Sequence, residues 1–190
     1  MKQAVYPSLA EARQYEKDYR CIPLSRTMLS DSRTPIEVLR VLKGVSKHCF
    51  LLESLEDART WGRYTFLGYQ PRLEFTALND TVRITAGTTV TIRTGDPNAE
   101  IRRIIEENKA PVLPGLPPFT GGLMGYFAYD SIKYAEPTLN LDARDEEHFN
   151  DIDLMLFDRL ICFDNFRQTI TVIRNIRTDA LEENYRAAEL

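Results

Sequence analysis

The sequence contains few of the residues that build catalytic and metal sites. Its 190 residues include only two histidines and three cysteines. Cys21, Cys49 and Cys162 are odd in number, far apart and set in apolar stretches. This pattern argues against a disulfide framework or a metal knuckle and predicts reduced core thiols of a cytoplasmic protein. His48 lies directly before an apolar stretch, where a helix-to-strand connection accounts for it without catalysis.

The chain also lacks an excess of positive charge and a long hydrophobic run. Its net charge is -4 and it has no basic cluster, so we do not expect nucleic acid as a partner. No apolar run approaches membrane-spanning length, and residues 1–7 contain no apolar signal region, so we expect no membrane partner. The apolar fraction of 43% and the charged fraction of 27% are typical of a soluble globular protein with a real core.

The glycine-rich and acidic stretches do not match known catalytic or metal-binding motifs. Phe119–Gly125 lacks both the lysine of a phosphate-binding loop and the spacing of a dinucleotide fingerprint, so strand packing is the favoured interpretation. Residues 142–153 carry six carboxylates beside His148, but their spacing matches no calcium loop. A solvated acidic face is therefore favoured over a metal scaffold. We predict no catalytic residue and no metal site, and hence a binding or regulatory segment.

Local capping patterns predict four helices. Capping boxes begin at Ser8 and Asp179, and a cap followed by proline begins at Thr34 and Asp96. The expected helices run from Leu9 to about Lys17, from Pro35 to Gly44, from Pro97 to near Asn108, and onward from Asp179, with a further short helix starting at Asp130. The last helix has no stop signal before Leu190. We therefore expect residues 1–190 to be the N-terminal regulatory segment of a longer chain.

Alternating and apolar runs predict a mainly antiparallel β protein between these helices. The expected strands cover residues 22–28, 49–52, 64–67, 72–78, 82–86, 90–94, 119–129, 152–163 and 169–176. Turns at Asn79-Asp80 and Gly87 favour hairpins, and Ile152–Phe163 is expected to form a hairpin with Thr169–Ile176. Three glycines between Phe119 and Asp130 indicate a bulge or a close backbone approach.

The stretch from Phe50 to Pro71 offers polar groups at the ends of two expected strands. Glu53 and Ser54 end the first strand, and Arg63 precedes the second. A carboxylate and a guanidinium at neighbouring strand ends are suited to grip a small zwitterion, with the apolar strand ends holding its side chain. The alternative is a hairpin whose polar ends face water, and the spacing alone favours that alternative.

Three motifs in order along the chain resemble the N-terminal part of anthranilate synthase component I. They are Leu51-Leu52-Glu53-Ser54, the run Gly62-Arg63-Tyr64-Thr65-Phe66-Leu67-Gly68, and Phe119-Thr120-Gly121-Gly122-Leu123-Met124-Gly125-Tyr126-Phe127 with Tyr129-Asp130. The resemblance extends from about Ile22 to Ile176. It implies an enzyme of tryptophan biosynthesis that makes anthranilate and pyruvate from chorismate, with ammonia delivered from glutamine by a partner amidotransferase subunit, component II. It also implies feedback inhibition by L-tryptophan.

The resemblance further implies where the functional groups lie. Leu52, Glu53 and Ser54 are expected to line the allosteric tryptophan site, and Arg63 is a candidate on the argument from its charge. The Mg²⁺ ligands, the chorismate-binding groups and the catalytic residues are expected in the C-terminal half, so this segment alone is predicted to be inactive. The implied fold is α+β, a two-layer α/β body with mainly antiparallel sheets and outer helices.

Two alternatives stay open from the sequence. The first is the N-terminal part of aminodeoxychorismate synthase component I, in the folate branch of the same superfamily. The second is a free-standing amino-acid-binding sensor without a catalytic domain. The intact Leu51–Ser54 and Gly62–Gly68 motifs favour anthranilate synthase over the folate enzyme.

Overall fold

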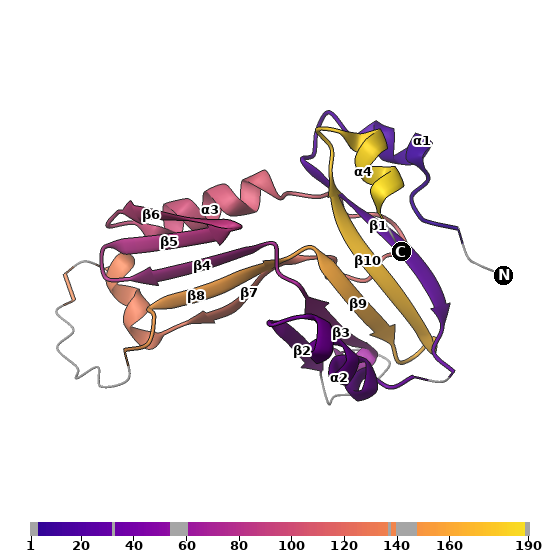
Figure 1. The fold of residues 1–190 in the computed structure, drawn as a ribbon, viewed down its shortest axis with the longest axis horizontal. Coiled ribbons are helices and arrows are strands. Elements are labelled where there is room, and N and C mark those ends of the chain that lie inside the picture. Colours follow the sequence, from indigo (N-terminus) through magenta and orange to yellow (C-terminus); the bar gives the residue numbers. More distant parts are fainter. Residues whose placement is uncertain (1–3, 32, 54–60, 137, 140–147, 189–190) are drawn as a thin grey trace. The chain divides into compact units, whose positions relative to one another are not determined.

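The computed structural model describes residues 4–31, 33–53, 61–136, 138–139 and 148–188. It divides into two compact units, each built on one five-stranded sheet (Figure 1). Unit 1 comprises Met1–Pro71, Asn108–Gly122 and Phe157–Leu190, and unit 2 comprises Arg72–Glu107 and Leu123–Leu156. The predicted α+β class with mainly antiparallel sheets is confirmed.

The sheet of unit 1 has the strand order β1-β10-β9-β3-β2. Its strands are β1 (Cys21–Leu29), β2 (Cys49–Glu53), β3 (Tyr64–Tyr69), β9 (Arg159–Asp164) and β10 (Thr169–Arg177). The antiparallel partner of β1 is β10, along its full length. The predicted hairpin between β9 and β10 is confirmed. Fully buried aliphatic side chains from four of these strands fill the core of the unit: Ile22, Leu24, Leu67, Leu160 and Ile173.

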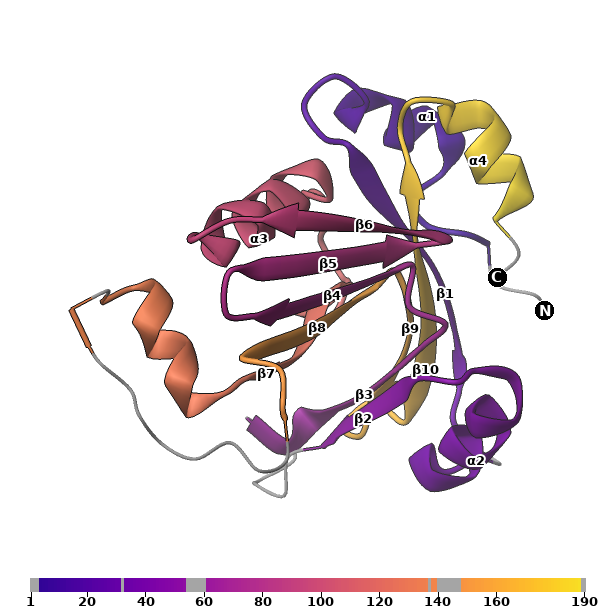
Figure 2. The ribbon, with the colours of Figure 1, turned by 60° about the vertical axis from the view of Figure 1, so that its left-hand side comes forward.

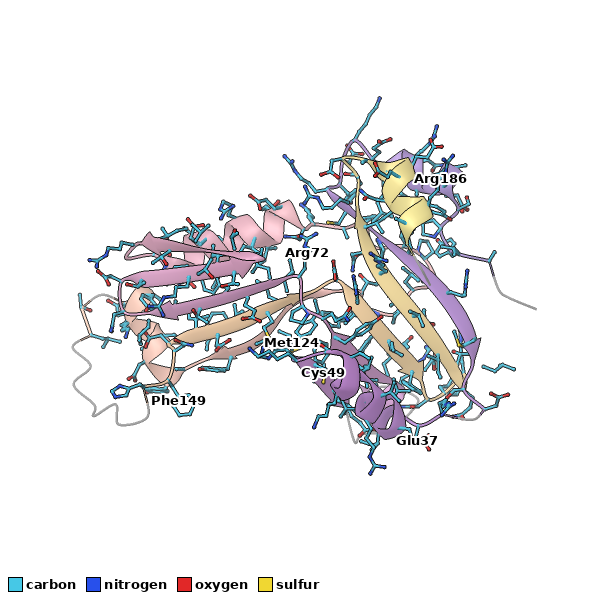
Figure 3. The ribbon with its side chains drawn as sticks, viewed as in Figure 1. Glu37, Cys49, Arg72, Met124, Phe149 and Arg186 are labelled. Carbon is cyan, nitrogen blue, oxygen red and sulfur yellow. The ribbon has the colours of Figure 1, made fainter. Side chains whose placement is uncertain are left out.

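Short helices flank this sheet. They are α1 (Leu9–Ala12), η1 (Arg13–Tyr15), α2 (Pro35–Val45), η2 (Trp61–Arg63) and α4 (Leu181–Ala187), the η elements being 3-10 turns. Figure 2 shows α1 and α4 side by side, and Ala12 and Leu181 share one buried cluster. Both predicted N-terminal caps of α1 and α2 are confirmed, because Ser8 and Thr34 each exchange hydrogen bonds with the glutamate three residues later. The second of these glutamates, Glu37, lies in the first turn of α2 (Figure 3).

Two predicted helix ends in unit 1 are wrong. The α-helix from Leu9 ends at Ala12 and tightens into a 3-10 turn that ends at Tyr15, short of Lys17. Gly44 lies inside α2, which continues to Val45. The chain leaves this helix at Ser46, whose hydroxyl accepts a hydrogen bond from the Gln70 N–H at 2.8 Å. A contact with a distant residue therefore sets the end of α2.

The predicted cap of the last helix is also wrong. Ala180 occupies the N-cap position of α4, and no side chain caps the helix there. The carboxylate of Asp179 instead lies 3.5 Å from the Arg177 guanidinium at the end of β10. The helix ends at Ala187, because Ala188 is extended, so it does not run on as the sequence pattern predicted.

The sheet of unit 2 has the strand order β6-β5-β4-β8-β7. Its elements are β4 (Leu73–Leu78), β5 (Thr81–Ala86), β6 (Thr88–Arg93), α3 (Pro97–Glu107), β7 (Gly122–Phe127), η3 (Tyr129–Tyr134) and β8 (Ile152–Phe157). Helix α3 covers this sheet by packing Ile101 and Ile104 into a cluster around Phe75 (Figure 1). Asp96 caps α3 as predicted, since its carboxylate accepts from the Ala99 N–H at 3.1 Å.

The predicted strand Ile152–Phe163 is in fact two strands in different sheets. Its first half, β8, pairs with β4, and its second half, β9, pairs with β3 and β10. The break falls at Asp158, whose carbonyl accepts from the Asn175 N–H at 2.8 Å outside the regular ladder. Both halves are buried, so the apolar run continues across the break. The length of the run therefore did not indicate that the chain changes sheet.

The predicted close approach at the glycines of β7 is confirmed. A Cβ atom on Gly125 would overlap the carbonyl oxygen of Asp153 in β8. A Cβ atom on Gly121 would overlap the amide of Asn175, which donates to the Thr120 carbonyl at 2.5 Å. Space therefore requires glycine at Gly125, where the overlap is with backbone, whereas at Gly121 the overlap is with a side-chain amide.

Candidate functional site

The Leu-Leu-Glu segment forms the last part of β2, an edge strand of the unit 1 sheet. Leu52 lies opposite Phe66 and Glu53 opposite Thr65 of β3. Successive side chains of a strand point to opposite faces, so Leu52 shares a face with Phe66 and Glu53 shares the other face with Thr65. Both are exposed, Leu52 by 49%, which is unusual for a leucine beside a packed sheet. Ser54 lies outside the described residues.

An aromatic cluster lies on the face that carries Leu52. The Phe50 and Phe157 rings meet edge to face at 4.9 Å, and the Phe66 and Phe119 rings do so at 5.6 Å. The Phe50 ring also covers Gly68, where a Cβ atom would overlap it. These edge-to-face contacts are the favourable geometry for aromatic pairs. The strand end where Leu52 lies therefore borders a packed aromatic cluster.

Arg63 lies in the 3-10 turn η2 and forms an ion pair with Asp164 at the end of β9. Its Nε lies 3.1 Å from both carboxylate oxygens, and its Nη2 lies 2.6 Å from Oδ2. The guanidinium carbon also lies 4.8 Å from the Tyr64 ring centre and 5.8 Å from that of Phe166. A two-point ion pair between aromatic rings holds the guanidinium in one orientation.

Asp164 is the centre of a wider hydrogen-bond network. Its Oδ1 accepts from the backbone N–H groups of Phe166 and Arg167 at 3.1 and 2.9 Å, which closes the turn between β9 and β10. Asn165 donates its backbone N–H to the Arg63 carbonyl at 2.8 Å and its amide to the Thr65 hydroxyl at 3.2 Å. The turn is thereby joined to the start of β3, opposite Glu53.

Charge and burial oppose each other at this ion pair. Burial acts to raise the pKa of Asp164, but hydrogen bonds from Arg63 and from the turn N–H groups outweigh it, so the pKa lies below its usual range. The hydrogen bond to Asp164 raises the pKa of Arg63. Asp164 is 10% exposed and Arg63 26%, so the pair is charged and largely shielded from water.

Leu52, Glu53 and Arg63, the predicted site residues that the structure describes, thus lie at one end of the sheet, where the ends of β2 and β9 flank the start of β3. Arg63 contacts Asp164, which lies 101 residues further along the chain and which no sequence motif singled out. Asp164 also lines a separate hollow of about 330 Å³ with Ser30, Asp31, Arg33, Thr34, Pro35, Phe163, Asn165 and Gln168. Leu52, Glu53 and Arg63 are not among the residues that line this hollow.

The acidic stretch near His148 has a structural role at Asp151, a buried carboxylate in the part of the stretch that the structure describes. Asp151 accepts from Lys133 Nζ at 2.8 Å, from the Tyr134 hydroxyl at 2.6 Å and from the Asn79 N–H at 2.9 Å. The acidic residues from Asp142 to Glu147 lie outside the described residues. Within the described ranges, no group of three histidine, cysteine or acidic side chains is arranged to hold a metal ion.

The three cysteines are free thiols, as predicted. Cys21 and Cys162 are buried and Cys49 is half-buried. Burial raises the pKa of the Cys162 thiol to about 12. Of the helices that the structure describes, none has the length and apolar character needed to cross a membrane.

The α+β fold of the chain resembles that of a solved structure. A crystal structure of anthranilate synthase component I from Streptococcus pneumoniae TIGR4 matches 84% of this chain and 34% of its own, with a TM-score of 0.52. Sequence identity in that match is 23%, so the comparison establishes the fold.

Sequence comparison identifies the relatives. No protein-family model matches the chain. Anthranilate synthase component 1 of Acinetobacter calcoaceticus is 36% identical over 177 residues, which cover 90% of this chain and 35% of that protein. The enzyme of the same name from Aquifex aeolicus is 34% identical, over 96% of this chain and 37% of its own length. The chain is therefore homologous to part of anthranilate synthase component 1 and spans about a third of the length of these relatives.

Proposed function

We propose that this chain is the N-terminal, tryptophan-sensing segment of an anthranilate synthase component I. The observation that carries the proposal is the homology over about 90% of the chain with proteins of that name. The whole cytoplasmic enzyme converts chorismate and ammonia into anthranilate and pyruvate, and component II supplies the ammonia from glutamine. Mg²⁺ and chorismate bind in the C-terminal catalytic half, so the segment alone has no activity.

The proposed tryptophan site consists of Leu52, Glu53, Ser54 and Arg63. A tryptophan zwitterion needs an anionic partner for its ammonium, a cationic partner for its carboxylate and an apolar surface for its indole ring. Glu53 and Arg63 supply the two charges. Leu52 points to the opposite face of β2 from Glu53, so a ligand at this exposed strand end would reach the apolar surface beside the aromatic cluster around the edge of the strand. The exposure of Leu52 and Glu53 at the end of an edge strand supports this assignment.

Inhibition is proposed to work by a population shift. Tryptophan favours an inactive state of the enzyme and so lowers its affinity for chorismate. Such coupling is typically about 1–3 kcal/mol and is reciprocal, so chorismate should weaken tryptophan binding by the same factor.

The test is anthranilate fluorescence from the protein encoded by the full reading frame, given chorismate, Mg²⁺ and ammonia. We expect activity that L-tryptophan suppresses, and no activity from residues 1–190 alone. Glu53→Gln should raise the tryptophan concentration for half-inhibition by about tenfold, the loss expected when about 1.4 kcal/mol of binding is removed. The matched control Glu16→Gln changes an exposed glutamate elsewhere and should leave inhibition unchanged.

Each other outcome has a defined meaning. Unchanged inhibition in both Glu53→Gln and Ser54→Ala would refute the proposed site. Turnover of chorismate to a product other than anthranilate would reassign the protein to the aminodeoxychorismate synthases. If the protein binds tryptophan but does not convert chorismate, the free-standing amino-acid-binding sensor would be the remaining function.

A further inference from the structure

Asp164 uses only one edge of the Arg63 guanidinium. Its carboxylate contacts Nε and Nη2, which form the side edge of the planar group. The end edge, made by Nη1 and the second N–H of Nη2, is not used by Asp164. A guanidinium can bind a carboxylate with two parallel hydrogen bonds at such an edge. Arg63 can therefore keep its ion pair with Asp164 and bind a second carboxylate at the same time.

The surroundings of Asp164 keep this orientation fixed. The carboxylate is held from the opposite side by the N–H groups of Phe166 and Arg167. Asn165 then ties the same turn to the Arg63 carbonyl and the Thr65 hydroxyl. Thr65 is fully buried. Hydrogen bonds thus connect the turn, the ion pair and the start of β3. Movement of any one of these parts would break several of these hydrogen bonds.

We propose that Asp164 is a positioning residue of the tryptophan site, which orients Arg63 so that the end edge that Asp164 does not contact binds the carboxylate of the amino acid. This inference rests on the proposed function. In the absence of Asp164, the flexible arginine side chain samples several rotamers and loses the two-point geometry. The ammonium and indole contacts of the ligand do not depend on Asp164, so its loss should affect carboxylate recognition selectively.

The test compares two ligands by calorimetry on the protein encoded by the full reading frame. L-Tryptophan carries the carboxylate, and L-tryptophan amide has the same ammonium and indole but no negative charge. In Asp164→Asn the side-chain oxygen can still accept from the turn N–H groups, while the charge is lost. We expect Asp164→Asn to weaken tryptophan binding by about tenfold and amide binding by less than about twofold.

Asp96→Asn is the matched control. Asp96 also combines an arginine ion pair, to Arg102 at 3.2 Å, with a hydrogen bond from a backbone N–H, but it lies in unit 2. Its replacement should leave the affinity for both ligands unchanged. Arg63→Lys is a second test variant, because lysine keeps the charge but cannot bind two carboxylates in a fixed plane. It should show the same selective loss of affinity for tryptophan over the amide.

The outcomes separate the two proposals. Failure of the unaltered protein to bind tryptophan overturns the proposed function and this inference with it. A second outcome is that the unaltered protein binds tryptophan, but Asp164→Asn and Arg63→Lys each lose equal affinity for both ligands. That outcome overturns the positioning role alone and makes the ion pair purely structural. Unchanged affinity for tryptophan in both variants also overturns the positioning role and leaves the proposed function standing.

Discussion

Asp151 provides the sharpest test of what stabilises unit 2. Its carboxylate is only 7% exposed and accepts hydrogen bonds from Lys133, Tyr134 and Asn79. We expect Asp151→Ala to leave these donors without their acceptor. The effect should appear as a loss of folding stability, with no change in the arrangement of unit 1.

The size of the loss follows from the three donors. A buried donor left unpaired costs about 1–3 kcal/mol. Lys133 is 27% exposed and regains water, so its contribution is discounted. The Tyr134 hydroxyl lies 2.6 Å from the Asn79 carbonyl and keeps that acceptor, which leaves the Asn79 N–H as the main uncompensated group. The total should therefore be about 1–3 kcal/mol.

Urea unfolding at pH 7 measures this loss directly. With a slope of about 2 kcal/mol per molar urea, the midpoint should fall by about 0.5–1.5 M. Hydrogen exchange at the Asn79 amide should accelerate, because Asp151 accepts from that N–H. Asp80→Ala, at an exposed neighbouring carboxylate, should change stability by less than about 0.5 kcal/mol. Equal effects of the two substitutions would refute the reasoning.

The same carboxylate gives a pH dependence of known sign. Burial acts to raise the pKa of Asp151, but Lys133, Tyr134 and Asn79 outweigh it, so the pKa is lowered in the folded protein. The stabilisation is therefore complete above the unfolded pKa of about 3.9 and is lost as the pH falls through the folded value. The stability difference between the unaltered protein and Asp151→Ala should be constant from pH 8 to 5 and shrink below about pH 4.

Three further predictions address packing and thiol chemistry. Phe75→Ala, at a side chain with no exposed surface, should destabilise the protein by about 3–5 kcal/mol in urea unfolding. Gly125→Ala should cost about 1–3 kcal/mol, because its Cβ overlaps the Asp153 backbone, whereas Gly95→Ala has open space and should be nearly neutral. Cys162 is buried and its pKa is raised to about 12, so at pH 8 it should react with a thiol reagent only after unfolding.

Each of these has a result that contradicts it. A loss below about 1 kcal/mol in Phe75→Ala would mean that its cluster does not hold unit 2 together. Equal stability of the two alanine variants would show that β7 and β8 do not approach closely at Gly125. Rapid labelling of Cys162 in the folded protein, identified by peptide mass, would show that β9 is accessible to reagents.

Much of the secondary structure was predictable because it depends on near neighbours. The caps of α1 and α2 form between near neighbours, so Ser8 with Glu11, and Thr34 followed by Pro35, were sufficient to place both helix starts. The turn at Asn79 was predictable for the same reason, since asparagine tolerates the left-handed backbone that it adopts there, with φ of 53°. The Leu52-Glu53 strand end of the candidate site was likewise visible as an apolar run that stops in polar residues.

The sequence by itself determined the local elements, the free thiols and the motifs that resemble anthranilate synthase component I. Only the tertiary structure decided the partners of those elements. It divided Ile152–Phe163 between two sheets, and it joined Arg63 to Asp164 across 101 residues. The physical reason is that strand pairing and buried ion pairs depend on which distant segments meet when the core closes, whereas caps and turns are complete within a few residues.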